Sequence, residues 1–597
     1  MCTLQRKRSL GKRPGSPPGG PVCTSCGDQV FEQRRRWLAD ANLLAGVSLR
    51  QLREDPAWLA VQVARQFPSR WRRVVRPTAE TRPGLLGTLR AVLADTPREA
   101  PRLAAGHEYK MRWLGTQVGM DPKSDDRTAL ARTAYVKGHL SEAAEVGRGT
   151  RVGARAGSEL ALLQPGFSLT THATPPRRAI PHRRDRALRV AMLLNNSLPH
   201  VQSGYAYRSQ SMLSALRDRG VDAQVWTRLG WPASVGRLGT AQIDVVDGVP
   251  YHRLHAAHLP SLPKDRWQRQ ADRLTEELAE FDPDVIHATT DWTNGLVAQA
   301  VATNLGVPWV YEMRGQIELS WAAQRPAPWR EEARASERVR LAGSKEIELA
   351  RAADAVLVLS QVQAEDLMAR GLVPERLRVL PNGVDATLLT HHSPAATARE
   401  ALGLPAEGCW VGSVSSLNEY EGLDTLIQAV ALARRQEVDV RCALVGDGAS
   451  HPTLEGLGAQ LGLGEHLVMP GRVSRAEALR WYSALDVFAV PRRDTAACRT
   501  ITPMKPLEAM ALGRPVVASD LPALRTIVDE DAGVLVPPCD AEALAEQLVL
   551  LAQNPTHRAA LGNGARRAAT SRTWAHNAEA SELLYHELVS LRPGRAR

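Results

Sequence analysis

Short apolar strands alternate with amphipathic helices from Leu188 onward, and this alternation constrains the fold more than any other feature of the chain. Two strands separated by a helix pair in parallel through a right-handed crossover, so the pattern predicts a Rossmann-like, doubly wound sheet. The strand-like segments of this first run lie at 189–195, 221–228, 284–289, 308–314, 355–360 and 377–385.

The same alternation restarts at Cys409 and predicts a second sheet of the same kind. Its strand-like segments lie at 410–415, 442–448, 466–473, 486–491, 515–519 and 533–538. Three helices close the chain, and the last, from about 573 to 591, is long enough to cross back to the first sheet. We therefore expect an α/β protein with two doubly wound domains that face each other across a cleft. Ligands of such domains bind at the carboxyl ends of the strands.

Changes in composition divide the chain of 597 residues into three expected regions. Residues 1–187 comprise a basic tail, a mostly helical extension and a Pro-rich linker. Residues 188–390 form the first sheet domain, and residues 391–597 form the second. The first 26 residues hold five Lys or Arg and no acidic residue, a composition typical of disorder.

Three features of the extension leave alternatives open. Cys23 and Cys26 have the spacing of half a zinc site, but no second pair follows at zinc-ribbon distance. The basic segment 68–77, PSRWRRVVRP, fits either a helix end that packs Trp71 inward, which we prefer, or contact with anionic lipid. Segment 131–146 resembles one tetratricopeptide-type turn, and one such repeat cannot bury its own apolar face.

Charge and cysteine content bear on partners and compartment. The net charge of +11 and the pI near 9.5 suit contact with nucleotide diphosphates, anionic lipid or nucleic acid, without choosing among them. No run of 18 or more apolar residues exists, and the amino terminus lacks the apolar core of a secretory signal. Seven cysteines spread over a long chain are not a disulfide framework. We expect a cytoplasmic protein, with peripheral contact to the inner membrane face or to a protein partner as an open alternative.

One stretch of the second sheet domain, residues 499–519, has the pattern of a phosphate-binding unit. It reads as a loop, a short helix that begins near Thr502, and a strand. Such a unit places free backbone N–H groups and the positive end of a helix dipole at the carboxyl edge of a sheet. Arg499 and Lys505 add cations, and Glu508 can accept hydrogen bonds from ribose hydroxyls. A helix that only packs its apolar face inward is the alternative.

This stretch resembles the nucleotide-sugar-binding signature of the retaining family-4 glycosyltransferases, which have the GT-B fold. PNGVD at 381–385 and GLDTLI at 422–427 are similar to other parts of the same family, and the matches together span about 400 residues. The resemblance implies that 188–390 is an acceptor domain and 391–597 a nucleotide-sugar donor domain. It also implies that Glu508 holds the donor ribose.

The resemblance implies a larger set of donor-binding residues. They are Gly204, Ser413, Gly446, Asp447, Gly448, Arg472, Val473, Arg499, Thr502, Lys505 and Glu508. The sequence departs from the family at three of its usual charged positions. Thr500 replaces the first Glu of the signature, and Ser413 and Glu421 replace the two cations that grip the diphosphate. Arg499 and Lys505 are the nearest substitutes along the sequence.

The candidate catalytic residues are His287, Arg314 and Glu508. By resemblance, His287 matches the first His of an H-x-H pair, in which Thr289 replaces the second. A His at the end of a strand can equally be structural. Arg314 ends the next strand and is expected to point into the cleft.

We expect transfer of a sugar from a nucleoside diphosphate to a hydroxyl of a glycan, polysaccharide or lipid-linked acceptor, with retention of configuration. The resemblance implies that catalysis consists mainly of stabilising the departing diphosphate. It implies no metal, no cofactor beyond the nucleotide-sugar substrate, and no nucleic-acid partner. Two alternatives stay open: an inactive GT-B scaffold whose extension recruits partners, and a GT-B nucleotide-sugar epimerase.

Overall fold

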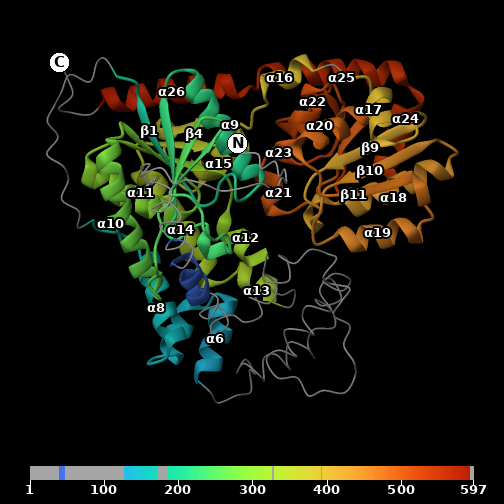
Figure 1. Cartoon of the computed structure of the whole chain (residues 1–597). Coiled ribbons are helices and arrows are strands. Elements are labelled where there is room, and N and C mark those ends of the chain that lie inside the picture. The colour runs from blue at the N-terminus through green and yellow to red at the C-terminus, as the bar shows by residue number, and fades with distance from the viewer. Residues whose placement is uncertain are drawn as a thin grey trace, which may run out of the picture.

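The computed structural model describes residues 36, 39–47, 127–171, 186–323, 325, 329–391 and 393–591. Over these residues it contains two sheets, each covered by helices on both faces, and a small helical group beside the first sheet (Figure 1). The predicted fold class, α/β with two doubly wound domains, is confirmed. The Cys23 and Cys26 pair and segment 68–77 lie outside the described residues.

The first sheet has eight strands in the order β3-β4-β2-β1-β5-β6-β7-β8. Every pair is parallel except β3 with β4. The six strands predicted for this domain are all present. The eight strands are β1 (Arg189–Leu194), β2 (Asp222–Thr227), β3 (Ile243–Val246), β4 (Val249–His252), β5 (Val285–Thr289), β6 (Trp309–Met313), β7 (Ala355–Val358) and β8 (Leu377–Val379).

The hairpin of β3 and β4 was missed, because we read a helix between β2 and the strand at 284–289. Its two-residue turn is Asp247 and Gly248, whose φ angles are 48° and 78°. An Asp-Gly pair between short β-branched segments is a strong hairpin signal, since both turn residues need positive φ. The signal was present in the sequence as VVDGVP at 245–250.

Helices connect these strands and pack around the sheet. They are α9 (Gly204–Asp218), α10 (Pro263–Phe281), α11 (Trp292–Leu305), α12 (Ile317–Ala323), α13 (Arg330–Arg334), α14 (Glu337–Ala352) and α15 (Gln361–Ala369). Alternate strand residues face two separate cores: Ile286 joins the core under α10, α11 and α14, and Val285 joins the core under α9. Burial on both faces explains why these strands are continuous apolar runs.

The second sheet has six parallel strands in the order β11-β10-β9-β12-β13-β14. They are β9 (Cys409–Val414), β10 (Val440–Val445), β11 (Leu467–Gly471), β12 (Val487–Val490), β13 (Val516–Ser519) and β14 (Gly533–Val536). The helices are α16 (Ala386–Thr390), α17 (Ala395–Leu402), α18 (Leu423–Arg435), α19 (His451–Gln460), α20 (Arg475–Ala484), α21 (Ala496–Thr500), α22 (Lys505–Ala511), α23 (Pro522–Arg525), α24 (Ala541–Gln553) and α25 (Pro555–Thr570). All six predicted strands are present.

The chain passes between the domains twice, and the two passages are hydrogen-bonded to each other. The Val384 N–H donates to the Arg572 carbonyl at 2.7 Å, and the Trp574 N–H donates to the Val384 carbonyl at 3.1 Å. After the second passage, α26 (Trp574–Ser590) lies against α9 of the first domain (Figure 1). Tyr585 on this helix is fully buried in the core under α9. The last helix therefore belongs to the first domain's packing.

The described part of the extension packs tightly on the first domain. It contains α6 (Arg127–Lys137), α7 (Leu140–Val146) and α8 (Arg151–Leu163), the first two joined at Gly138 with φ +92°. Leu162 and Leu169 belong to the same core as the first sheet. The buried Lys345 ammonium donates to the Gln164 carbonyl at 2.7 Å. A boundary at 188 therefore cuts through a shared core, and residues 127–171 are structurally continuous with the first domain.

Candidate functional site

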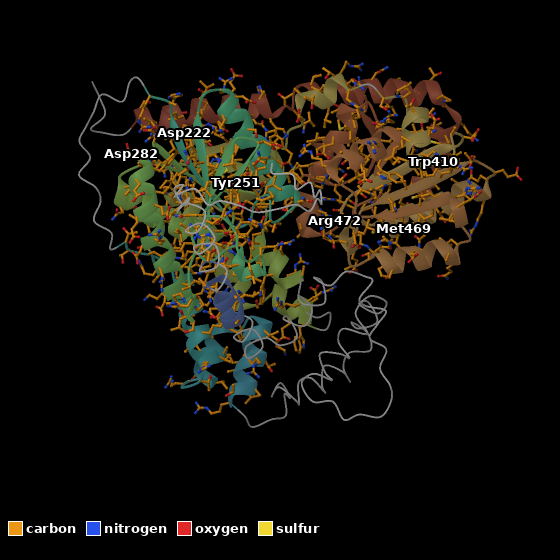
Figure 2. The ribbon with its side chains drawn as sticks, in the orientation of Figure 1. Asp222, Tyr251, Asp282, Trp410, Met469 and Arg472 are labelled. Carbon is orange, nitrogen blue, oxygen red and sulfur yellow. The ribbon has the colours of Figure 1, made fainter. Side chains whose placement is uncertain are left out.

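The predicted donor residues of the second domain gather at one edge of its sheet. All six strands are parallel, so their carboxyl ends share an edge, and the order places β9 beside β12 where the connections change direction. Ser413 is the last residue but one of β9, Gly446 follows β10, and Arg472 follows β11. Figure 2 shows Arg472 on the side of the second domain that faces the first.

The turn after β10 lies directly against the loop after β9. Gly446 has φ +140°, and a Cβ there would stand 1.8 Å from the Ser415 carbonyl oxygen. A Cβ at Gly448 would stand 2.3 Å from the Leu417 oxygen. Both positions therefore require glycine for packing. Between them, the Asp447 side chain is 67% exposed and stays accessible at the edge.

Glu508 is held in a fixed orientation by two donors. The Tyr482 hydroxyl donates to Glu508 Oε2 at 2.7 Å, and Lys505 Nζ donates to the same oxygen at 3.2 Å. The Glu508 side chain is 16% exposed, and its Oε1 accepts no hydrogen bond from the described residues. The ordered carboxylate thus keeps one oxygen available to a ligand, as the predicted ribose contact requires.

The helix that carries Glu508 starts later than predicted. It begins at Lys505, preceded by Met504 in helical conformation, and Thr502 lies outside it. Thr502 instead accepts hydrogen bonds from Asn382 Nδ2 of the first domain, at 2.8 Å to the carbonyl oxygen and 3.4 Å to Oγ1. The prediction that Thr502 opens the helix was wrong, because the loop at this point is used to contact the other domain.

Arg499 and Lys505 each pair with a different carboxylate. Arg499 lies on the short helix α21, and its guanidinium donates to both carboxylate oxygens of Asp494, at 2.5 and 2.6 Å. Its side chain is 55% exposed. Lys505, by contrast, stands beside Glu508. Of the two cations predicted to replace the family's diphosphate pair, only Lys505 contacts Glu508.

A cation that the sequence did not point out, Arg492, lies at the end of β12. Its Nε and Nη2 donate to the two carboxylate oxygens of Glu421, each at 3.0 Å, and its Nη1 donates to the Ile501 carbonyl at 3.2 Å. Burial lowers the pKa of Arg492, but Glu421 outweighs this and raises it. By resemblance, the position of Glu421 normally holds a cation. We call Glu421 and Arg492 the reversed pair, because the acid stands at the family's cation position and the cation lies after the neighbouring strand.

Residues from the first domain reach this edge. Arg472 Nη2 donates to the Gln202 carbonyl at 3.3 Å, and the Arg475 guanidinium lies 5.0 Å from the centre of the Tyr207 ring. Gly204 is the first residue of α9, and no atom lies within 4 Å of a Cβ built there. The loop before α9 thus meets the turn after β11, where Val473 is half-buried against the domain core.

His287 and Arg314 lie inside the first domain rather than on the cleft wall. The His287 side chain is 1% exposed, with Nδ1 at 2.6 Å from the Tyr585 hydroxyl and Nε2 at 3.2 Å from Glu312 Oε2. Arg314 is 2% exposed and donates to Glu312 Oε2 at 2.5 Å. His287 Nε2 and Arg314 Nε make no hydrogen bond to the described residues, while the other polar atoms of both side chains contact protein groups. The near-complete burial of both side chains favours the structural interpretation of His287.

Glu312 is the centre of this buried network. Its Oε1 accepts from Arg208 Nε at 2.9 Å and from Nη2 at 2.7 Å. Burial opposes ionisation, but Arg314 and Arg208 outweigh it and hold the pKa of Glu312 well below its usual range. Arg208 also donates to the Leu380 carbonyl at 2.8 Å and to Asn382 Oδ1 at 3.0 Å. Through Asn382 the network is connected to Thr502 of the second domain.

The end of β6 also faces the second domain. Gly315 and Glu318 line a cavity of about 10 Å³ together with Thr500 and Ile501, a volume that suits about one water molecule. Burial raises the pKa of Glu318. Glu346, on the same cavity, accepts from the Trp292 N–H at 2.8 Å and is hydrogen-bonded to the Tyr311 hydroxyl. Gly315 and Glu318 therefore meet the second domain at this cavity.

No group of three or more His, Cys, Asp or Glu among the described residues is arranged to hold a metal ion. No helix among them is both long enough and apolar enough to cross a membrane.

Two doubly wound domains that face each other, with glycine-containing turns at the carboxyl edge of the second sheet, are the arrangement of the GT-B class. The chain also matches two family models: "Glycosyl transferase 4-like domain" over residues 203–383 and "Glycosyl transferases group 1" over residues 408–554. It is 30% identical over 440 residues to a D-inositol 3-phosphate glycosyltransferase of Xylanimonas cellulosilytica, covering 69% of this chain and 99% of that one. A Kineococcus radiotolerans protein of the same name is 28% identical over 436 residues, 67% of this chain and 95% of its own. The protein therefore belongs to the group 1 glycosyltransferases.

Solved structures agree on the fold. Sucrose-phosphate synthase from Thermosynechococcus elongatus superposes with a TM-score of 0.54 at 23% identity, over 68% of this chain and all of its own. Anabaena HepE, in complex with UDP and glucose, gives 0.52 at 20% identity over 67% of this chain and all of its own. The predicted GT-B fold is confirmed.

Proposed function

We propose that this glycosyltransferase transfers a sugar from a nucleoside diphosphate to a hydroxyl acceptor, with retention of anomeric configuration. The proposal rests on the position and the hydrogen bonds of the Glu508 carboxylate. Its carboxylate is ordered by Tyr482 and Lys505, stands at the carboxyl edge of the donor-type sheet, and leaves Oε1 available to a ribose hydroxyl. Charge-assisted hydrogen bonds of this kind are stronger than neutral ones.

The surrounding groups support a donor that lies along this edge. The Gly446 N–H donates to the Gly471 carbonyl at 2.9 Å, and Arg472, the next residue, donates to Gln202 in the first domain's loop before α9. A nucleotide bound at these turns would therefore touch both domains. Lys505 supplies positive charge beside the ribose position, and Arg492 supplies it at the end of β12. In this proposal the residues stabilise the departing diphosphate, the main task in such a transfer.

The test is calorimetric titration of UDP, GDP and ADP into wild type and Glu508→Ala. Loss of a charge-assisted hydrogen bond costs about 1.5–3 kcal/mol, so the dissociation constant should rise roughly 10- to 100-fold. Glu455→Ala, an exposed residue on α19, is the matched control and should bind as wild type does. Equal affinities for all three nucleotides in wild type and Glu508→Ala would remove Glu508 from the site.

Acceptor and stereochemistry need separate assays. The two relatives are named for D-inositol 3-phosphate, and we propose that a polyol, glycan or lipid-linked hydroxyl accepts the sugar here. Product formation with inositol 3-phosphate, compared with a glycan acceptor, distinguishes these classes. The anomeric configuration of the product, measured by NMR, tests retention: an inverted product would refute it. Activity that survives EDTA would agree with a metal-independent transfer.

An inactive scaffold is the second candidate, and one observation favours it. Glu421 neutralises Arg492 and Asp494 neutralises Arg499, so less positive charge faces a diphosphate than the family pattern provides. Donor hydrolysis by the purified full-length protein decides between the two. Nucleotide binding without any hydrolysis or transfer, across all three donor bases and both acceptor classes, would favour the scaffold.

A further inference from the structure

A second pocket lies on the second domain, away from the donor edge. It has a volume of about 400 Å³ and is lined by His391, Ser393, Pro394, Ser483, Leu512, Gly513, Arg514, Asn563 and Arg566. Gly513 and Arg514 directly precede β13, so the pocket lies at the amino ends of the strands. The donor site lies at the carboxyl ends. Figure 1 shows the helices that surround the pocket, α16, α17, α20, α22 and α25, grouped together on the second domain.

The lining is cationic and contains no carboxylate among its nine described residues. Arg514 and Arg566 both line it, and His391 adds a group that becomes a cation when protonated. The nearest acid, Asp486, is paired with Arg399 and also accepts from the Trp410 N–H. Positive side chains on one pocket wall attract an anion.

Arg514 is poorly satisfied by the protein. Its Nε is buried and makes no hydrogen bond to the described residues, and its Nη2 makes only a long one, 3.5 Å to the Ser393 carbonyl. Burial, with Arg399 and Arg566 nearby, lowers the pKa of Arg514, while Asp486 opposes this change. Buried donors without partners are uncommon in native proteins, and a bound ion is one of the groups that can satisfy them.

We propose that this pocket binds the phosphate group of a small phosphorylated molecule. Guanidinium groups suit the planar, bidentate recognition of phosphate oxygens. Asn563 and Ser393 add neutral hydrogen-bonding groups at the wall. A volume of about 400 Å³ falls in the range of small-molecule sites, which favours a phosphorylated metabolite over a bare ion.

The pocket is connected to the donor site by one short helix. Lys505 and Glu508 lie in the first four residues of α22, and Leu512 and Gly513 follow its last turn. Seven residues of helix span about 10 Å. The pocket and the donor residues Lys505 and Glu508 therefore lie at opposite ends of one short helix.

The test is calorimetry on the full-length protein with UDP present in excess to fill the donor site. Glucose 1-phosphate and inorganic phosphate are titrated separately, which distinguishes a sugar phosphate from the free ion. Wild type should bind one equivalent of glucose 1-phosphate, and its affinity should fall as salt increases. Asn563→Asp places a carboxylate on the pocket wall with almost no change in shape, and should weaken binding roughly tenfold or more.

Two further variants make the outcome decisive. Gln460→Glu adds the same charge at an exposed site on α19 and should bind as wild type does. Arg514→Gln should abolish binding, with a thermal melt to show that it is folded. Unchanged affinity in Asn563→Asp, no binding of either compound by wild type, or competition between UDP and the phosphate compound would each overturn the proposal.

Discussion

Replacing Glu312 with Gln should destabilise the protein severely, although the side chains have nearly the same shape. The Glu312 side chain is 3% exposed and lies between Arg208, Arg314 and His287. Removing one partner from a buried ion pair costs about 3–5 kcal/mol, because the remaining charge stays buried without compensation. For a domain of roughly 200 residues, each kcal/mol lowers the melting temperature by about 2–4 °C. We expect a decrease of about 6–20 °C.

Differential scanning calorimetry at neutral pH measures this decrease. Glu375→Gln, an exposed acid-to-amide change in the same domain, is the control and should melt within about 2 °C of wild type. The pKa of Glu312 is depressed in the folded protein, so its stabilisation is present above the unfolded value near 4.3 and is lost as pH falls below it. The difference between wild type and Glu312→Gln should therefore shrink in acid. A melting difference below about 3 °C at pH 7 would refute the reasoning.

Three other perturbations follow from the structure. Burial raises the pKa of Glu346 to about 8. The contribution of Glu346 to stability is therefore complete below the pKa of the unfolded state and is lost as pH rises toward 8. In Glu346→Gln the difference between the melting temperatures at pH 5 and pH 9 should be smaller than in wild type. Asn382→Ala removes the bond to the Thr502 carbonyl and should raise KM for the donor more than it lowers kcat, whereas a proportional fall in kcat alone would contradict a positioning role. A chain that starts at 186 loses the contacts of Leu162 and should melt well below one that starts at 127, and equal melting would show that the extension does not support the first core.

The repeating pattern of strands was predictable because burial on both faces leaves an unambiguous apolar run. Val285 to Thr289 and Val487 to Val490 are buried at every position, and both were recognised. The hairpin at 243–252 was not, since its outer strand has no buried position and the Asp-Gly turn was overlooked. The residues of the turn, rather than the hydrophobic pattern, indicated this hairpin.

The site was only partly predictable, because sequence patterns locate an edge but do not assign partners. Glu508 was found from its motif, and its neighbour Tyr482 was not, since the two are 26 positions apart. Arg314 ends its strand as predicted, yet the carboxylate of Glu312, two residues before it, draws it inward. A charged residue at a strand end points to a ligand only when no buried opposite charge competes for it.

The reversed pair of Glu421 and Arg492 shows how a donor edge can depart from its family without losing its charges. By resemblance, the position of Glu421 normally holds a cation, and here that position is acidic. Arg492, one strand away, lies within 3.0 Å of the Glu421 carboxylate and so returns a cation to the edge. The pair is nearly neutral, and its two side chains are only 10% and 13% exposed. A diphosphate must therefore compete with Glu421 for Arg492. Lys505 pairs with Glu508 in the same manner, so Arg492 and Lys505 are both paired before a ligand arrives. Such pairing orients them in advance, and it also means that net affinity depends on how easily each carboxylate gives up its partner.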